Sequence, residues 1–125
     1  LLPAMIDDLF RAGREATRAD ASHQRMHQFR LRTKRVRYTL ELFEPVYEGE
    51  IEEIMESLKG LQGKLGAIND CATTLEMIRR DRDAAAAVRQ LAGKREAEFR
   101  TYWKQHFGPS DRVRWKAVLS AADGK

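Results

Sequence analysis

The stretch IEEIMESLKGLQGKLGAI, residues 51–68, is the part of the sequence that most clearly predicts the fold. Its large apolar residues recur at alternating steps of three and four: Ile51, Ile54, Leu58, Leu61, Leu65 and Ile68. This spacing places side chains along one side of an α-helix, in register with a heptad repeat. We therefore expect a long helix that begins near Glu50 and packs in a helical bundle.

Three glycines, at positions 60, 63 and 66, lie within this predicted helix. Each lowers helix stability by about 1 kcal/mol relative to alanine. We expect a compensating reason, which is the close approach of a neighbouring helix backbone or of a ligand. Further on, Asn69-Asp70 either caps a second segment, from about Cys71 to Arg80, or lies within one continuous helix.

The sequence on the N-terminal side of this stretch also predicts helices. Apolar periodicity indicates a first helix over about Pro3–Arg18. Ser22 is the expected N-cap of a second helix, about His23–Glu44, which stops before Pro45 because the residue that precedes a proline disfavours helical geometry.

Two more helices are predicted towards the C-terminus, about Asp83–Phe107 and a short final helix capped by Ser110. The apolar residues expected to make their contacts are Val88, Leu91, Phe99, Tyr102, Trp103, Phe107, Val113, Trp115, Val118 and Leu119. No alternating strand pattern occurs. The expected fold class is therefore all-α, a single domain over residues 1–125 that forms an antiparallel bundle of four to five helices.

The composition fits a soluble, helix-rich protein, with 42% hydrophobic and 34% charged residues among 125. No apolar run approaches the roughly 20 residues that span a bilayer, and no signal peptide is visible, so we expect no membrane association. Cys71 is the single cysteine, which excludes an internal disulfide and favours the reducing cytoplasm.

The segment HQFRLRTKRVRYTLE, residues 27–41, concentrates positive charge. Between Asp20 and Glu41 there is no acidic residue, and there are six basic ones: Arg25, Arg30, Arg32, Lys34, Arg35 and Arg37. At about 100° per residue, one stripe of this helix is formed by His27, Arg30, Lys34 and Arg37. The roughly opposite, apolar stripe is formed by Phe29, Val36, Leu40 and Phe43.

A helix that packs by one face and presents cations from another suits a polyanion. Two simpler interpretations fit the same pattern: a basic face that is only solvated, and a surface ion pair between Arg37 and Glu41.

Two motifs together resemble the CHAD family, the conserved histidine α-helical domain. The first is the basic motif from His27 to Phe43, and the second is LKGLQGKLGAIND, residues 58–70; both occur in the family's order and spacing, and the resemblance covers about 22–107. It implies a non-catalytic helical bundle that binds inorganic polyphosphate through a basic groove or pore. It also implies a cytoplasmic location, in some members at polyphosphate granules.

The resemblance also indicates which residues contact polyphosphate. The first candidates are His27, Arg30, Lys34, Arg35, Arg37 and Tyr38, and the secondary ones are Lys59, Lys64, Lys94 and Arg95. Core packing is an equally good expectation for Tyr38, and Asn69 and Asp70 are expected to act as caps or to orient the basic side chains. A full family domain holds two such repeats and this chain holds one, which implies a homodimer or a missing second repeat.

The chemistry of the basic stripe matches a repeating anion. Successive helical turns place side chains about 5.4 Å apart. Arginine offers forked donors to phosphate oxygens, and lysine offers a point charge. Histidine adds charge when protonated, so binding is expected to strengthen in mild acid. Because each contact releases counterions, affinity should fall steeply with salt.

Other functions find less support in the sequence. A nucleic-acid binder would use the same stripe, but aromatic side chains are not interleaved with the cations as single strands require. A protein-interaction module with a solvated basic face is a third interpretation. No catalytic triad or glycine-rich phosphate loop stands out, so we expect no enzyme, and no Cys or His cluster completes a metal site around Asp20, His23 and His27. No cofactor is expected.

Overall fold

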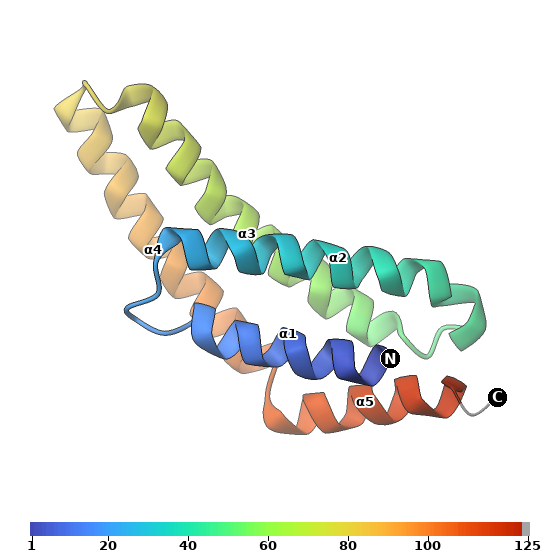
Figure 1. Cartoon of the computed structure of the whole chain (residues 1–125). Coiled ribbons are helices and arrows are strands. Elements are labelled where there is room, and N and C mark those ends of the chain that lie inside the picture. The colour runs from blue at the N-terminus through green and yellow to red at the C-terminus, as the bar shows by residue number, and fades with distance from the viewer. Residues whose placement is uncertain (124–125) are drawn as a thin grey trace.

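The computed structural model describes residues 1–123 and is all-α over that range (Figure 1). Its five helices are α1 Leu2–Ala16, α2 His23–Tyr47, α3 Glu52–Ile78, α4 Arg82–His106 and α5 Pro109–Asp123. The predicted fold class, an all-α bundle of four to five helices, is confirmed. None of the helices over these residues carries an apolar stretch sufficient to span a bilayer.

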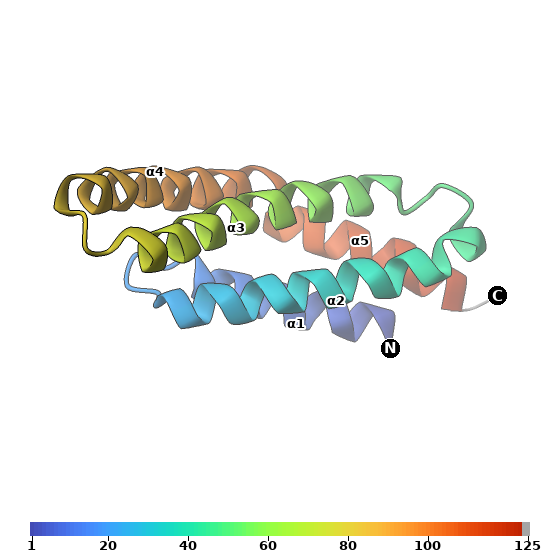
Figure 2. The ribbon, with the colours of Figure 1, turned by 90° about the horizontal axis from the view of Figure 1, so that it is seen from above.

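The helices form successive antiparallel pairs, α1 with α2, α2 with α3 and α3 with α4 (Figures 1 and 2). The last helix, α5, lies along α1. The joined ends of α3 and α4 project beyond the other helices (Figure 1). This order leaves α2 with one edge against α1 and the other edge against α3.

The predicted apolar seam of α3 is the centre of the core. All six of its residues, from Ile51 to Ile68, are buried. The aromatic rings of α4 and α5 extend the core towards α1: Trp103 stacks on Phe107 at 4.6 Å between ring centroids, and both rings contact Phe10. Trp103, Phe107 and Trp115 were expected to make either core or dimer contacts, and the structure buries all three in the core.

Helix α2 begins where the sequence predicts but ends later than predicted. The Ser22 side chain accepts a hydrogen bond from the Arg25 backbone N–H at 3.0 Å, so Ser22 is the N-cap as predicted. The expected stop before Pro45 is wrong, because α2 continues to Tyr47. A proline so near the helix end removes one backbone hydrogen bond of the last turns and does not break a long helix. The chain turns instead at Glu48 and Gly49, where φ is positive.

The structure also settles two other predicted helix boundaries, one within α3 and one at the start of α5. Helix α3 passes through Asn69 and Asp70 without a break, so the continuous-helix alternative is the right one. The expected Ser110 cap is wrong, because α5 already begins at Pro109. Proline is pre-organised for the first helical position, and the Gly108 backbone N–H donates to the Asp111 carboxylate at 2.9 Å.

Three apolar residues predicted to face the core are exposed: Phe43, Leu91 and Val113. In α2 the buried stripe continues from Leu40 to Tyr47, which leaves Phe43 at its edge. The other two lie where a helix has a single packed side, since only α3 covers that part of α4 and only α1 covers much of α5.

Candidate functional site

The candidate site is the groove between α2 and α3. A hollow of about 310 Å³ opens there, and its lining residues are His23, Gln24, Met26, His27, Arg30, Leu65, Ile68, Asn69 and Ala72. Buried Met26, Phe29 and Val36 fix the rotation of α2, and this rotation turns His27 and Arg30 towards the hollow. The floor is largely apolar, and its polar groups come from both helices.

Three basic side chains follow the α2 side of this groove at successive turns: His27, Arg30 and Lys34, here called the basic column. His27 is exposed, and Arg30 and Lys34 are half-buried. Over residues 1–123, none of the three forms an ion pair with a carboxylate. The Arg30 Nε atom is buried and has no hydrogen-bond partner. The basic column is therefore a set of uncompensated donors beside a hollow.

Arg37 continues the column in sequence but has partners in the structure. Its Nε donates to Glu41 Oε1 at 3.0 Å, and its Nη1 donates to Gln62 Oε1 at 2.8 Å. The alternative of an Arg37–Glu41 ion pair is therefore confirmed, and Arg37 ties α2 to α3 rather than standing as a free cation. Its guanidinium also lies 5.1 Å from the Tyr38 ring centroid.

Tyr38 and Arg35 lie on the outward side of α2. Tyr38 is 50% exposed, so the alternative that placed it in the core is wrong. Arg35 is exposed and, in the described part of the chain, forms no ion pair. Both residues are accessible to a partner, but neither lines the hollow.

The glycines of α3 behave in two different ways. A Cβ atom at Gly60 would lie 1.9 Å from the Tyr102 hydroxyl oxygen. The absence of a side chain at Gly60 therefore lets α4 approach closely, and the group that approaches is the Tyr102 side chain rather than the α4 backbone. A Cβ atom at Gly63 or Gly66 would meet nothing within 4 Å. Packing within this chain therefore requires glycine at position 60 and not at positions 63 and 66.

Gly66 lies on the side of α3 that faces α2. It comes one turn after Gln62, which bonds Arg37, and one turn before Asn69, which lines the hollow. Residues three and four apart share one face of a helix. The spacing therefore places Gly66 on the groove side of α3, next to residues that line the hollow but not among them.

The secondary candidates do not join the basic column. Lys64 and Lys94 meet at a separate hollow of about 340 Å³ between α3 and α4, where the Lys64 Nζ lies 6.0 Å from the Tyr102 ring centroid. Arg95 donates to both carboxylate oxygens of Glu98, at 2.9 and 3.0 Å. Lys59 is exposed on α3. Of the ten predicted residues, His27 and Arg30 line the α2–α3 hollow, and Lys64 and Lys94 line the α3–α4 hollow.

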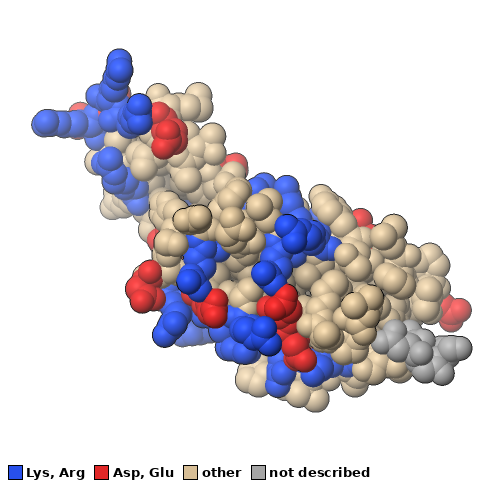
Figure 3. Space-filling model, in the orientation of Figure 1, with Lys and Arg blue, Asp and Glu red and all other residues tan. Residues whose placement is uncertain are grey.

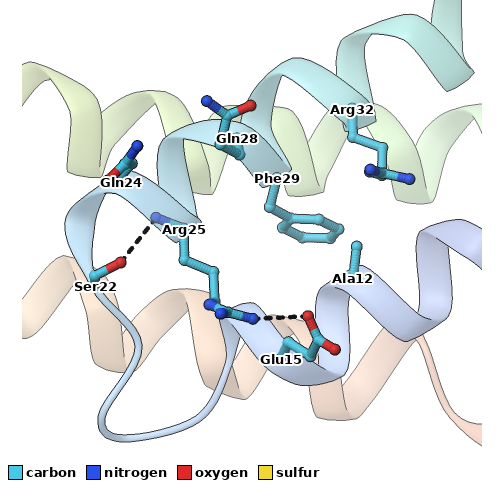
Figure 4. Close-up of a pocket in the computed structure, with 8 residues that line it drawn as sticks. All are labelled: Ala12, Glu15, Ser22, Gln24, Arg25, Gln28, Phe29 and Arg32. Carbon is cyan, nitrogen blue, oxygen red and sulfur yellow. Dashed lines mark hydrogen bonds and ion pairs between the residues drawn. The ribbon is translucent and has the colours of Figure 1, made fainter.

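The other edge of α2 carries cations that are already neutralised. Arg25 donates to Glu15 at 2.7 Å, and Arg32 is paired with Asp8, so both bridge α2 to α1. Figure 4 shows the hollow of about 320 Å³ at this edge, with the Phe29 ring in it and Arg25 turned towards Glu15. Because its arginines have carboxylate partners, this hollow is less suited to an anion than the α2–α3 groove.

One group of cations was not singled out from the sequence, although three arginines within four residues were visible there. Arg79, Arg80 and Arg82 are exposed at the turn between α3 and α4. Lysine and arginine side chains gather at this projecting end in Figure 3 and again over the middle of the molecule. Over residues 1–123, no group of three or more His, Cys, Asp or Glu side chains is arranged to hold a metal ion.

Comparison with known families gives one match. A family model described as CHAD domain matches residues 1–79, which contain α1, α2, α3, the basic column and the α3 glycines. The match begins and ends earlier than the 22–107 expected from the motifs, so Lys94 and Arg95 lie outside it. No curated protein and no solved structure matches the chain.

Proposed function

The chain belongs to the CHAD domain family, and from this membership and the groove we propose that it is a non-catalytic module that binds inorganic polyphosphate. The family is associated with polyphosphate binding in general terms. The observation that carries the proposal for this chain is the basic column, because over residues 1–123 none of its three side chains forms an ion pair with a carboxylate. A bound phosphate would supply the anionic partner that these side chains lack.

The three members of the column supply different donors. The Arg30 guanidinium is planar and engages two oxygens at once, whereas the Lys34 ammonium acts as a point charge. His27 donates from a ring nitrogen and gains charge on protonation. Their spacing of about 5.4 Å per turn lets a polymer with one charge every few ångströms contact each of them. Arg37 and Gln62 act as positioning residues that hold α2 against α3.

The direct test is binding of long-chain polyphosphate to Arg30→Gln and Lys34→Gln variants. We expect each to bind several-fold more weakly, with a shallower dependence on salt, because each removes one phosphate contact. Arg14→Gln is the matched control, since Arg14 is an exposed cation on α1 away from the groove. Unchanged binding by both column variants would overturn the proposal.

A single-stranded nucleic acid is the second candidate ligand, and one observation favours it. Tyr38 and Phe43 are exposed, at 50% and 38%, on the helix that carries the basic column. Exposed aromatic rings beside cations are what single strands stack on. Competition between polyphosphate and single- and double-stranded nucleic acid at physiological salt separates the candidates, and tighter binding of nucleic acid would select the second.

The remaining parts of the proposal concern activity and context. We expect no phosphate release from polyphosphate in the presence of Mg²⁺, and steady release would make the protein a hydrolase. We expect the protein in the cytoplasm, at polyphosphate granules where these form, which fluorescence microscopy of a tagged protein would check. A second copy or a second repeat is expected to complete the binding surface.

A further inference from the structure

The hollow between α2 and α3 has an apolar floor that inorganic polyphosphate leaves unused. Met26 of α2 reaches it from one side, Leu65 and Ile68 of α3 reach it from the other, and Ala72 is the last α3 residue that lines it. A polyphosphate chain consists of charged phosphates and has no apolar group to cover such a floor. Small-molecule sites are mostly apolar, with a few polar groups that fix the orientation of the ligand. The floor therefore indicates a ligand that has an uncharged part as well as phosphates.

Two amide side chains lie at the same hollow, one from each helix. Gln24 belongs to α2 and Asn69 to α3, and over residues 1–123 neither side chain forms a hydrogen bond. An amide side chain offers both donors and an acceptor. Proteins recognise a nucleobase by hydrogen bonds to its edge and by apolar contacts on its face. An acyl chain, in contrast, would leave both amides unused.

The two ends of the hollow differ in charge. At the end where α2 begins, the His23 Nε2 atom lies 3.3 Å from the Glu96 Oε1 atom, so a carboxylate of α4 stands behind this end. At the other end Arg30 lines the hollow, and Lys34 follows one turn later on α2. A phosphate is therefore attracted towards Arg30 and repelled from Glu96. This asymmetry gives a bound ligand one orientation, with its phosphates along the basic column and its uncharged part near His23.

We propose that the hollow is a nucleobase subsite, and that the groove binds a nucleoside triphosphate with the base on the apolar floor. The inference rests on the proposed function, because the phosphates occupy the same basic column. The hollow of about 310 Å³ lies at the small end of the range for small-molecule sites, which suits one base. From Arg30 to Lys34 the helix rises about 6 Å, a distance that three linked phosphates cover.

Isothermal titration of the full chain with ATP and with inorganic tripolyphosphate, at one salt concentration and without divalent cations, tests the subsite. Both ligands contain three phosphates, and tripolyphosphate carries at least as much negative charge. Tighter binding of ATP therefore measures the contribution of the nucleoside. We expect ATP to bind about tenfold more tightly, because one face of the base leaves water for the apolar floor. Equal or weaker binding of ATP would overturn the inference.

Ala72→Leu tests where the base lies. Ala72 is half-buried at the hollow, and a leucine there would fill the space proposed for the base. Ala67→Leu is the matched control, since Ala67 is also half-buried on α3 but lines a different hollow, against α4. Ala72→Leu should lower the affinity for ATP to that for tripolyphosphate, and Ala67→Leu should keep the tenfold difference. A difference that survives in a folded Ala72→Leu variant would overturn the placement of the base.

Saturation-transfer NMR locates the base without any substitution. Irradiation of the protein methyl resonances should transfer saturation mainly to the base protons of ATP, because Met26, Leu65 and Ile68 supply methyl groups at the floor. Base protons that receive no saturation would overturn the subsite.

The base subsite and the proposed function fail separately. A wild type that binds long-chain polyphosphate, but binds ATP no more tightly than tripolyphosphate, overturns the base subsite alone. A wild type that prefers ATP to tripolyphosphate but does not bind long-chain polyphosphate overturns the proposed function.

Discussion

Gly66→Gln is the substitution that best separates the needs of the fold from those of the groove. A Cβ atom at this position would meet nothing within 4 Å, so no steric cost opposes a side chain. Glutamine in place of glycine inside a helix stabilises it by about 0.5–1 kcal/mol. For a chain of 125 residues this corresponds to a rise in Tm of about 2–4 °C.

The same side chain should impair the proposed ligand site. Helical spacing places it between Gln62 and Asn69, on the side of α3 that faces α2 and next to the hollow. A polymer displaced from one contact of the basic column should lose about 1.4 kcal/mol, or tenfold in affinity. The expected result is therefore a protein that is more stable and binds polyphosphate more weakly.

Thermal unfolding and isothermal titration of the same samples provide the assay. Gly93→Gln is the control, because Gly93 is also within a helix with open space around its Cβ position, but on α4. It should gain the same stability and keep full affinity. If Gly66→Gln gained stability with unchanged affinity, the glycine would have no role for a ligand, and a loss of stability would contradict the open space.

Three further predictions concern the fold. Gly60→Ala should destabilise by about 1–3 kcal/mol, since its Cβ would lie 1.9 Å from the Tyr102 hydroxyl oxygen; urea denaturation measures this, and a neutral effect would mean that Tyr102 moves aside freely. Hydrogen bonds from Lys116 and Arg112 lower the pKa of the Asp7 carboxyl, so the stability that this carboxylate contributes is complete above the ordinary aspartate pKa and is lost as the pH falls through the lowered pKa. Asp7→Asn should therefore lower Tm at neutral pH, and the difference in Tm from the wild type should shrink towards acid. A difference in Tm that stays constant with pH would contradict this. Ser22→Ala should cost about 1 kcal/mol, because the cap of α2 is lost; an unchanged unfolding free energy would show that the cap is dispensable.

The core of the fold was predictable because its signal is local and repeated. The six seam residues recur along one helix face over many turns, and all six are buried in the structure. The end of α2 was not predictable in the same way. The rule that helices stop before proline is a statement about interior positions, and Pro45 lies close enough to the helix end for the helix to continue to Tyr47.

The candidate site was predictable in part. Helical spacing placed His27, Arg30 and Lys34 on one side of α2, and the structure places the first two at the hollow. Spacing alone did not show that Arg37 bonds Gln62, or that Lys64 and Lys94 lie at another groove. Those facts depend on how α2, α3 and α4 are rotated against one another, and a single helix pattern carries no such information.

The central claim is that polyphosphate lies in the α2–α3 groove, and the most direct test is amide chemical-shift mapping by NMR during a titration with long-chain polyphosphate. The account predicts the largest shifts at His27, Arg30, Lys34, Gly66 and Asn69. Shifts centred instead on Lys64 and Lys94, or on the arginines at the turn between α3 and α4, would contradict it, as would a titration without shifts.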